Sequence, residues 1–279
     1  MKKISRRSFL AAAGLSVAAL ALTACGGSSA STASSVASSA ASSEAASTSA
    51  SAGELTTVEA GKLTMATNAA FPPYEMTTDA GEFEGIDIET AQAIADKLGL
   101  ELQIDDMDFD AALLSVQQGK ADIAMAGITV TDERKAVMAF SDSYATGIQS
   151  IIVPEGSDIA SPDDLAGKKI GTQRGTTGYI YCSDDFGDEN VVAYDDGLTA
   201  VQALNNGQVD AVVIDNAPAK EFVAANPGLV ILDTSYAEED YAIGMAKGSS
   251  LEDAVNAALK ELKADGTLQS IVDKYITAE

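Results

Sequence analysis

The chain of 279 residues is strongly acidic, with 42 Asp and Glu against 17 Lys and Arg and a net charge of −25 at pH 7. Because affinity for nucleic acid depends on neutralising phosphates, this balance excludes nucleic acid as a partner. The sequence has no histidine, which removes the commonest general base, the Ser-His-Asp arrangement and most zinc sites, and puts enzyme functions at a disadvantage.

Residues 1–24 have the pattern of a signal peptide. They begin with basic residues and continue as an apolar run from Leu10 to Ala24, which is too short to span a bilayer comfortably. Leu22-Thr23-Ala24-Cys25 is similar to a bacterial lipobox and predicts that Cys25 is the lipidated first residue of the mature protein, with palmitate among its chains. Residues 5–10, SRRSFL, also resemble a twin-arginine signal, so the Sec and Tat export routes both stay open.

Residues 25–54 predict a disordered tether behind the lipidated cysteine. From Gly26 to Gly53 nearly every residue is Ser, Ala, Thr or Gly, a composition that cannot offset the entropy of ordering. As a random coil this stretch reaches about 30 Å. With Cys25 lipidated, Cys182 is the one remaining thiol, and we expect a plain buried or half-exposed cysteine there.

The folded part begins with a strand at residues 62–67. The loop after it contains two prolines, which forbid a helix and display the rings of Phe71 and Tyr74. We expect Asp87 to cap the next helix, which ends at Gly99. A strand from residue 100 to 104 then leads into a helix that presents Phe109 at its start.

Residues 121–142 combine a buried strand, a polar turn and a cationic helix start. An apolar run at residues 123–126 ends at Gly127, where backbone can approach another group closely, and the hydroxyl of Thr129 follows. Thr131 or Asp132 is expected to cap a helix with Arg134 in its first turn. The helix dipole disfavours a cation at this position. The presence of an arginine there therefore suggests that Arg134 binds a carboxylate or phosphate group. The alternative is a solvated arginine paired with its acidic neighbours.

A faint internal repeat suggests two α/β lobes of similar construction. Residues 112–127 align without gaps on residues 200–215 as helix, glycine and buried strand. One strand ends at Gly127 and the other at Asp215, and ligands of open α/β sheets gather beyond the carboxyl ends of strands.

Two extended segments predict a two-stranded hinge between the lobes. Residues 55–143 and 244–279 would form lobe 1, residues 149–238 would form lobe 2, and residues 144–148 and 239–243 would join them. In lobe 2, Gly175-Thr176-Thr177-Gly178 precedes a helix and is either an anion site or an ordinary turn.

Taken together, these segments resemble the extracellular solute-binding proteins that serve polar amino acid ABC transporters. The resemblance covers nearly all of residues 62–276, and it is carried by ATNAAFPPYE, GEFEGIDIETAQAIADKLGL, MDFDAAL, QQGKADIAMAGITVTDERKAVMAFSDSY, SPDDLAGKKIGTQRGTTG, NNGQVDAVVIDNAPA and ALKELKADGTLQSIVDKY. It implies an α/β, two-lobe fold of the type II periplasmic-binding-protein kind.

The resemblance also implies a role for each site residue. Arg134 and the Thr177 end of the GTTG loop, with Thr176 beside it, would hold the α-carboxylate of an amino acid. Asp215, the Gly127 carbonyl and the Thr129 hydroxyl would hold its α-ammonium group. Phe71 and Phe109, with Tyr74 more peripheral, would sandwich the ligand side chain, and Asn68 and Gln173 would line its far end.

One departure concerns selectivity. Binders of basic amino acids in this family often have Asp where this chain has Asn68, although Glu75 or Asp108 could still supply a distal carboxylate.

The implied function is binding of a polar free amino acid outside the cytoplasmic membrane and its delivery to an ABC permease. We expect a monomer held at the membrane by its lipid, with no cofactor, no metal and no catalytic residue. Two alternatives stay open: a ligand-binding sensor domain, and a dehydratase built on the same fold.

Overall fold

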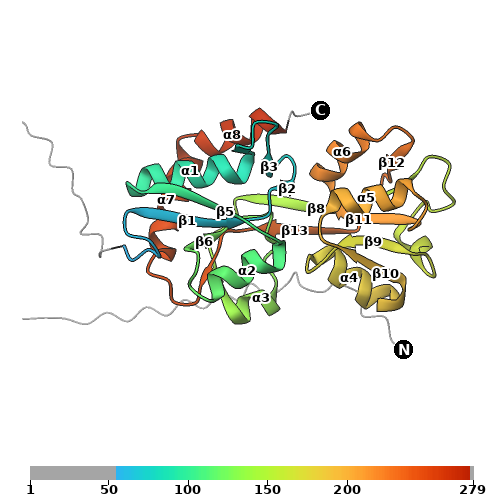
Figure 1. The fold of residues 1–279 in the computed structure, drawn as a ribbon, viewed down its shortest axis with the longest axis horizontal. Coiled ribbons are helices and arrows are strands. Elements are labelled where there is room, and N and C mark those ends of the chain that lie inside the picture. The colour runs from blue at the N-terminus through green and yellow to red at the C-terminus, as the bar shows by residue number, and fades with distance from the viewer. Residues whose placement is uncertain (1–54, 277–279) are drawn as a thin grey trace, which may run out of the picture. The chain divides into compact units, whose positions relative to one another are not determined.

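The computed structural model describes residues 55–276. The expected signal peptide, Cys25 and the tether lie outside the described residues. Within residues 55–276 no helix is long and apolar enough to cross a membrane. The described chain belongs to one compact unit, whose two main sheets form two lobes (Figure 1).

Lobe 1 is built on a five-stranded sheet of order β5-β1-β6-β14-β7. Its strands are β1 (Lys62–Thr67), β5 (Glu101–Asp106), β6 (Ile123–Ala124), β7 (Met138–Phe140) and β14 (Gly244–Ala246). β1 pairs in parallel with both β5 and β6, whereas β14 runs antiparallel to its neighbours. Because β1 and β6 are parallel, their carboxyl ends lie at the same edge of the sheet.

Helices cover both faces of this sheet. Alternate residues of the strands point to opposite sides, so Leu63 and Met65 pack with the cluster of helix α1 (Ile86–Leu98). Ala66 and Ala124 instead pack with helix α2 (Phe109–Gln117). The short helix α3 (Asp132–Val137) and the C-terminal helices α7 (Glu252–Ala264) and α8 (Thr267–Tyr275) complete the lobe. A small antiparallel sheet follows β1 and consists of β2 (Ala70–Phe71), β3 (Glu75–Thr77) and β4 (Phe83–Glu84).

Lobe 2 is built on a sheet of order β10-β9-β11-β8-β12 with β13 beside β8. These strands are β8 (Ala145–Pro154), β9 (Ile170–Gln173), β10 (Val191–Tyr194), β11 (Ala211–Asp215), β12 (Leu229–Ile231) and β13 (Ala237–Tyr241). Helix α4 (Thr177–Phe186) packs on one face through the buried Cys182. Helices α5 (Gly197–Asn205) and α6 (Asn216–Ala225) pack on the other. Short 3-10 turns lie at Pro162–Leu165 and Asp188–Asn190.

The chain passes between the lobes along two paired segments. It leaves β7 of lobe 1 for the long strand β8, and it returns from β13 to β14. The first half of β8 pairs with β13 in antiparallel register, so that Gly147 lies opposite Glu239. The expected lobe boundaries and hinge segments stay predictions, but this paired crossing is the feature that would form such a hinge.

One expectation for the elements is wrong. Asp87 does not cap α1: the helix begins at Ile86, its N-cap is Gly85, and no side chain caps it. Asp87 is fully buried one position inside the helix. Its carboxylate accepts hydrogen bonds from two groups distant in sequence, the N–H of Gly127 at 3.0 Å and the hydroxyl of Tyr144 at 2.8 Å. These long-range partners hold Asp87 away from its own helix end.

Candidate functional site

A cavity lies where residues of the two lobes face each other. Its internal volume is about 10 Å³, about the space of one water-sized sphere. Lobe 1 and lobe 2 both contribute to its wall, which is formed by Asn68, Phe71, Glu75, Phe109, Ala126, Gly127, Thr129, Arg134, Gln173, Thr176, Thr177 and Asp215. Of the site residues named from the sequence, all line this one cavity except Tyr74 and Asp108; of the two carboxylates considered for the far end of the ligand, only Glu75 reaches it.

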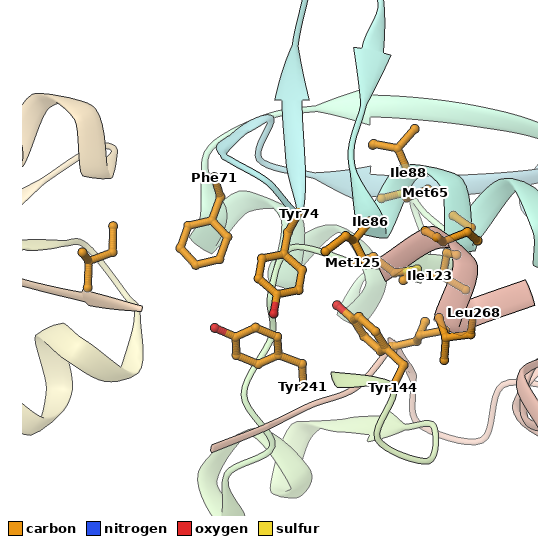
Figure 2. Packing of buried hydrophobic residues seen from close by; sticks show 14 of the residues in the cluster. Met65, Phe71, Tyr74, Ile86, Ile88, Ile123, Met125, Tyr144, Tyr241 and Leu268 are labelled. Carbon is orange, nitrogen blue, oxygen red and sulfur yellow. The ribbon is translucent and has the colours of Figure 1, made fainter. Parts of the chain in front are cut away.

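Tyr74 lies behind the cavity wall and supports it. Its ring centroid is 5.9 Å from that of Phe71 and 5.2 Å from that of Tyr241, the latter in an edge-on arrangement. Figure 2 shows these three rings next to one another, beside Ile86 and Tyr144. Tyr74 thus fixes the position of Phe71 rather than forming the wall itself.

Arg134 is buried at the cavity, with 8% of its surface exposed. α3 positions it, because the hydroxyl of the N-cap Thr131 accepts the Arg134 N–H at 3.2 Å. Its guanidinium donates to the carbonyl of Thr129 at 2.8 Å and, across to lobe 2, to the carbonyl of Gly175 at 3.1 Å. Within residues 55–276 it forms no ion pair with a carboxylate. The alternative of a solvated arginine paired with its acidic neighbours is therefore wrong.

The surroundings of Arg134 suit an anion. Its guanidinium lies 5.2 Å from the centroid of the Phe109 ring. Burial lowers the pKa of Arg134, while the charge of Glu239 acts in the opposite direction. A buried guanidinium stays charged, and a buried charge is costly unless a partner is close. A carboxylate entering the cavity would supply one.

Asp215 brings a carboxylate to the same cavity at the carboxyl end of β11. It accepts hydrogen bonds from the hydroxyl of Tyr241 and, at 2.8 Å, from the Nε2 of Gln149. Burial, as the largest cause, raises the pKa of Asp215 from 3.8 to about 7, and the charge of Glu239 adds to this, whereas the Tyr241 hydrogen bond opposes it. A cation in the cavity would restore its usual acidity.

The buried carboxylate of Asp87 holds the Gly127 backbone in place. Gly127 has a φ of +53°, and a Cβ there would lie 2.7 Å from the Phe71 ring, so only glycine fits. Its N–H is bound by Asp87, and the carboxyl of Asp87 lies against that of Glu75. Within the described chain no donor reaches the Oδ1 of Asp87 or either oxygen of Glu75. Burial, followed by the charge of Asp87, raises the pKa of Glu75 well above its usual range.

Amide and hydroxyl groups close the cavity on the lobe 2 side. The Nε2 of Gln173 donates to the Oδ1 of Asn68 at 2.8 Å and so joins the lobes. Thr176 is the N-cap of α4 and accepts the N–H of Tyr179 at 3.3 Å, while its hydroxyl donates to the Gln173 carbonyl at 2.8 Å. Thr177 begins the helix behind it.

The structure adds residues that the sequence reasoning missed. Glu239, Tyr241 and Gln149 form the buried polar layer next to Asp215, and none of them was expected at the site. A weak signal exists for Glu239: β13 buries alternate residues, so the acid two positions before the large ring of Tyr241 faces inward. Neighbouring Glu238 and Asp240 are exposed and chemically similar, so composition does not single out Glu239.

A family model described as bacterial extracellular solute-binding proteins, family 3, matches residues 63–278. The chain belongs to this family. Among its relatives, the L-cystine-binding protein TcyJ of Escherichia coli (strain K12) is 32% identical over 79% of this chain and 85% of TcyJ. The arginine-binding extracellular protein ArtP of Bacillus subtilis (strain 168) is 33% identical over 78% of this chain and 87% of ArtP.

Solved structures agree with this family 3 fold. The arginine-, lysine-, histidine-binding protein ArtJ from Geobacillus stearothermophilus matches with a TM-score of 0.75 and 34% identity, over 78% of this chain and 96% of ArtJ. An ancestral arginine-binding protein bound to glutamine matches with a TM-score of 0.75 and 40% identity, over 78% of this chain and 99% of that protein. The expected α/β, two-lobe architecture is confirmed.

Proposed function

We propose that this family 3 protein binds a free polar amino acid outside the cytoplasmic membrane and delivers it to an ABC transporter permease. One observation carries the proposal. A buried arginine of lobe 1 and a buried aspartate of lobe 2, Arg134 and Asp215, line the same small cavity. A zwitterion that enters between the lobes needs one charge of each sign, and these two side chains supply them.

The other lining residues support the same ligand. The Gly127 carbonyl and Thr129 lie with Asp215 in the wall, where an ammonium group would find acceptors. Phe71 and Phe109 offer flat apolar faces to a side chain. The amides of Asn68 and Gln173 and the carboxyl of Glu75 suit a ligand side chain that carries N–H donors. Relatives whose names specify cystine, histidine or arginine are consistent with a polar amino acid.

The experiment is a thermal-shift screen of the twenty amino acids followed by calorimetry on Arg134→Ala and Asp215→Ala. Binding to the folded state raises the melting temperature. Each variant should lose on the order of 3–5 kcal/mol of binding free energy, or roughly two to four decades in affinity, because one ligand charge is left buried without a partner. A surface ion pair would cost under about 1 kcal/mol.

The melting temperatures of the free variants serve as the folding control. If a variant folds normally and binds within about fivefold of the parent, that residue does not hold the ligand. Recovery of the bound ligand in unchanged form, with no product, would also distinguish binding from the dehydratase alternative. We propose that the protein has no catalytic step.

We also propose that the mature protein is a monomer anchored to the membrane by lipid on Cys25. The lipobox-like motif and the Ser- and Ala-rich tether behind it support this arrangement. The tether expected from this composition, with a reach of about 30 Å, supports delivery to a separate permease over a sensor role, because it would let the binding domain approach a neighbouring protein.

A further inference from the structure

Three buried oxygen atoms form a closed triangle next to the cavity. The Oε2 of Glu239 lies 3.1 Å from the hydroxyl of Thr129 and 2.9 Å from the hydroxyl of Thr177. The two hydroxyls are 3.3 Å from each other. Thr129 comes from lobe 1 and Thr177 from the first turn of α4 in lobe 2, and both line the cavity. Glu239 lies behind them on β13 and is not part of the wall.

The protons of this triangle can be counted. Each hydroxyl has one proton to donate, and an ionised carboxylate has none. Gln149 supplies a third donor to the same Glu239 oxygen at 3.0 Å. The two hydroxyls either both donate to Glu239, or one donates to the other, which then donates to Glu239. In every such arrangement both hydroxyl protons are used inside the triangle, and only oxygen lone pairs are left for the cavity.

From this count we propose that Glu239 is a positioning residue that determines which ligand group the two hydroxyls bind. Because the hydroxyls of Thr129 and Thr177 donate their hydrogen bonds within the triangle that Glu239 completes, they can only accept hydrogen bonds from the ligand. Both therefore contact the ligand ammonium group, and neither donates to the ligand carboxylate. The inference rests on the proposed amino acid binding. It changes the role of the Thr177 side chain, because the family resemblance places the Thr177 end of the GTTG loop at the carboxylate.

The charges around the triangle act in the same direction. Gln149 donates from one nitrogen to Glu239 and, at 2.8 Å, to Asp215, so it holds two carboxylates together on this side of the cavity. A negative field here favours an ammonium group over a carboxylate. The ligand carboxylate is left to Arg134, where a buried cation faces the cavity.

The test uses three probes that differ in one charged group. L-Arginine has both groups, agmatine lacks the carboxylate, and 5-guanidinopentanoate lacks the ammonium. Thr177→Val keeps the side-chain shape and removes the hydroxyl. It should weaken L-arginine and agmatine about tenfold or more in calorimetry, as expected for a hydrogen bond to a charged group, and leave 5-guanidinopentanoate within about twofold. A loss confined to L-arginine and 5-guanidinopentanoate, or no loss with any probe, would overturn the proposal.

Glu239→Gln tests the carboxylate itself, with Glu238→Gln as a matched control on the exposed side of the same strand. Removing the charge should weaken L-arginine and agmatine by about tenfold and leave 5-guanidinopentanoate unchanged or tighter. The control should bind all three probes as the parent does. A purely structural role for Glu239 would weaken the three probes equally, and that result contradicts the proposal.

The same comparison is made with L-glutamine, 4-aminobutanamide and 4-carbamoylbutanoate, so that a preference for an amide side chain does not hide the effect. If neither L-cystine nor any of the twenty amino acids binds the parent protein, the proposed function fails and this inference fails with it. If L-arginine or L-glutamine binds the parent but Thr177→Val loses the analogue without ammonium, the function stands and only the role of Glu239 is overturned.

Discussion

Asp215 is a carboxyl whose ionisation changes near neutral pH, since burial raises its pKa to about 7. The groups that face it are Glu239, Tyr241 and Gln149, while Arg134 and Glu75 also interact with it through their charges. Only the ionised form can balance an ammonium group. Proton binding to Asp215 and ligand binding are therefore expected to compete.

We predict that affinity for the amino acid falls as the pH drops from 8 to 5, by up to about tenfold per pH unit below 7. Calorimetry across this range measures it, and Asp215→Asn should bind weakly with a flatter profile. An affinity independent of pH in the parent protein would mean that Asp215 is ionised throughout or makes no contact with the ligand.

The contribution of Asp215 to the stability of the free protein should rise as the pH drops, whereas the affinity for ligand falls. A carboxyl with a raised folded-state pKa binds its proton more readily when folded, so its contribution to stability is present below the unfolded value of 3.8 and is lost as the pH rises through about 7. Asp87, with a pKa raised to about 6 by burial, contributes with the same sign. Protonation of Asp215 and Asp87 at low pH therefore does not destabilise the fold, and it cannot explain a loss of affinity through unfolding.

At the scale of elements, the paired strands β8 and β13 connect the crossing between lobes to the site. Gly147 of β8 lies opposite Glu239, and a Cβ on it would lie 2.4 Å from the ring of Tyr241. Tyr241 is fully buried and its hydroxyl binds Asp215. The absence of a side chain at Gly147 therefore lets the ring reach the carboxylate.

Gly147→Ala should lower the free energy of unfolding by about 1–3 kcal/mol through overpacking, and it should also weaken ligand binding because the Tyr241 hydroxyl moves from Asp215. Denaturant unfolding and calorimetry measure the two effects. Ile148→Ala, at the next and more exposed position of the strand, is the control and should change stability by less than about 0.5 kcal/mol. Equal effects of the two variants would show that the close contact with Tyr241 has no special role.

At the scale of the whole molecule, the cavity of about 10 Å³ is too small to admit an amino acid without movement of its walls. Lobe 1 and lobe 2 already meet through bonds such as Gln173 to Asn68 and Arg134 to the Gly175 carbonyl. A ligand that contacts both lobes would bias them toward a closed arrangement with the ligand between them, and the two-strand crossing is the place where they would bend.

The radius of gyration from small-angle scattering should therefore decrease when the amino acid found in the screen is added. Gln173→Ala, which removes a bond between the lobes, is the control for a free protein that is already closed. If neither the ligand nor this variant changes the radius of gyration, the lobes do not act as a hinged clamp.

The anchor proposal is tested on the intact chain in cells. Cys25→Ala removes the thiol that would carry lipid, and the domain should then appear outside the membrane fraction with its ligand binding unchanged. Fractionation with an antibody against the binding domain measures this. A variant that stays with the membrane fraction would contradict lipid anchoring through Cys25.

The sequence alone determined the alternation of strands and helices and most of the cavity wall. Asp215 ends the buried strand β11, and Gly127 follows three residues after β6, which is shorter than the expected strand at residues 123–126. Arg134 follows the predicted cap at Thr131. These features depend on local signals: apolar runs, glycines, caps and the chemistry of side chains at strand ends. Parallel strands place their carboxyl ends at one edge, so local signals sufficed to place the predicted site residues near one another.

Only the tertiary structure decided which polar groups support that wall. Local pattern assigned Asp87 to a helix cap, but its partners Gly127 and Tyr144 lie far along the chain. Glu239 is one of several adjacent acids, and it faces the hydroxyls only because β13 pairs with β8 in a particular register. The pKa of Asp215 likewise depends on burial and on Glu239, Tyr241 and Gln149, which lie far from it along the chain. Burial, strand register and long-range hydrogen bonds arise when distant segments pack together, and no local pattern contains them.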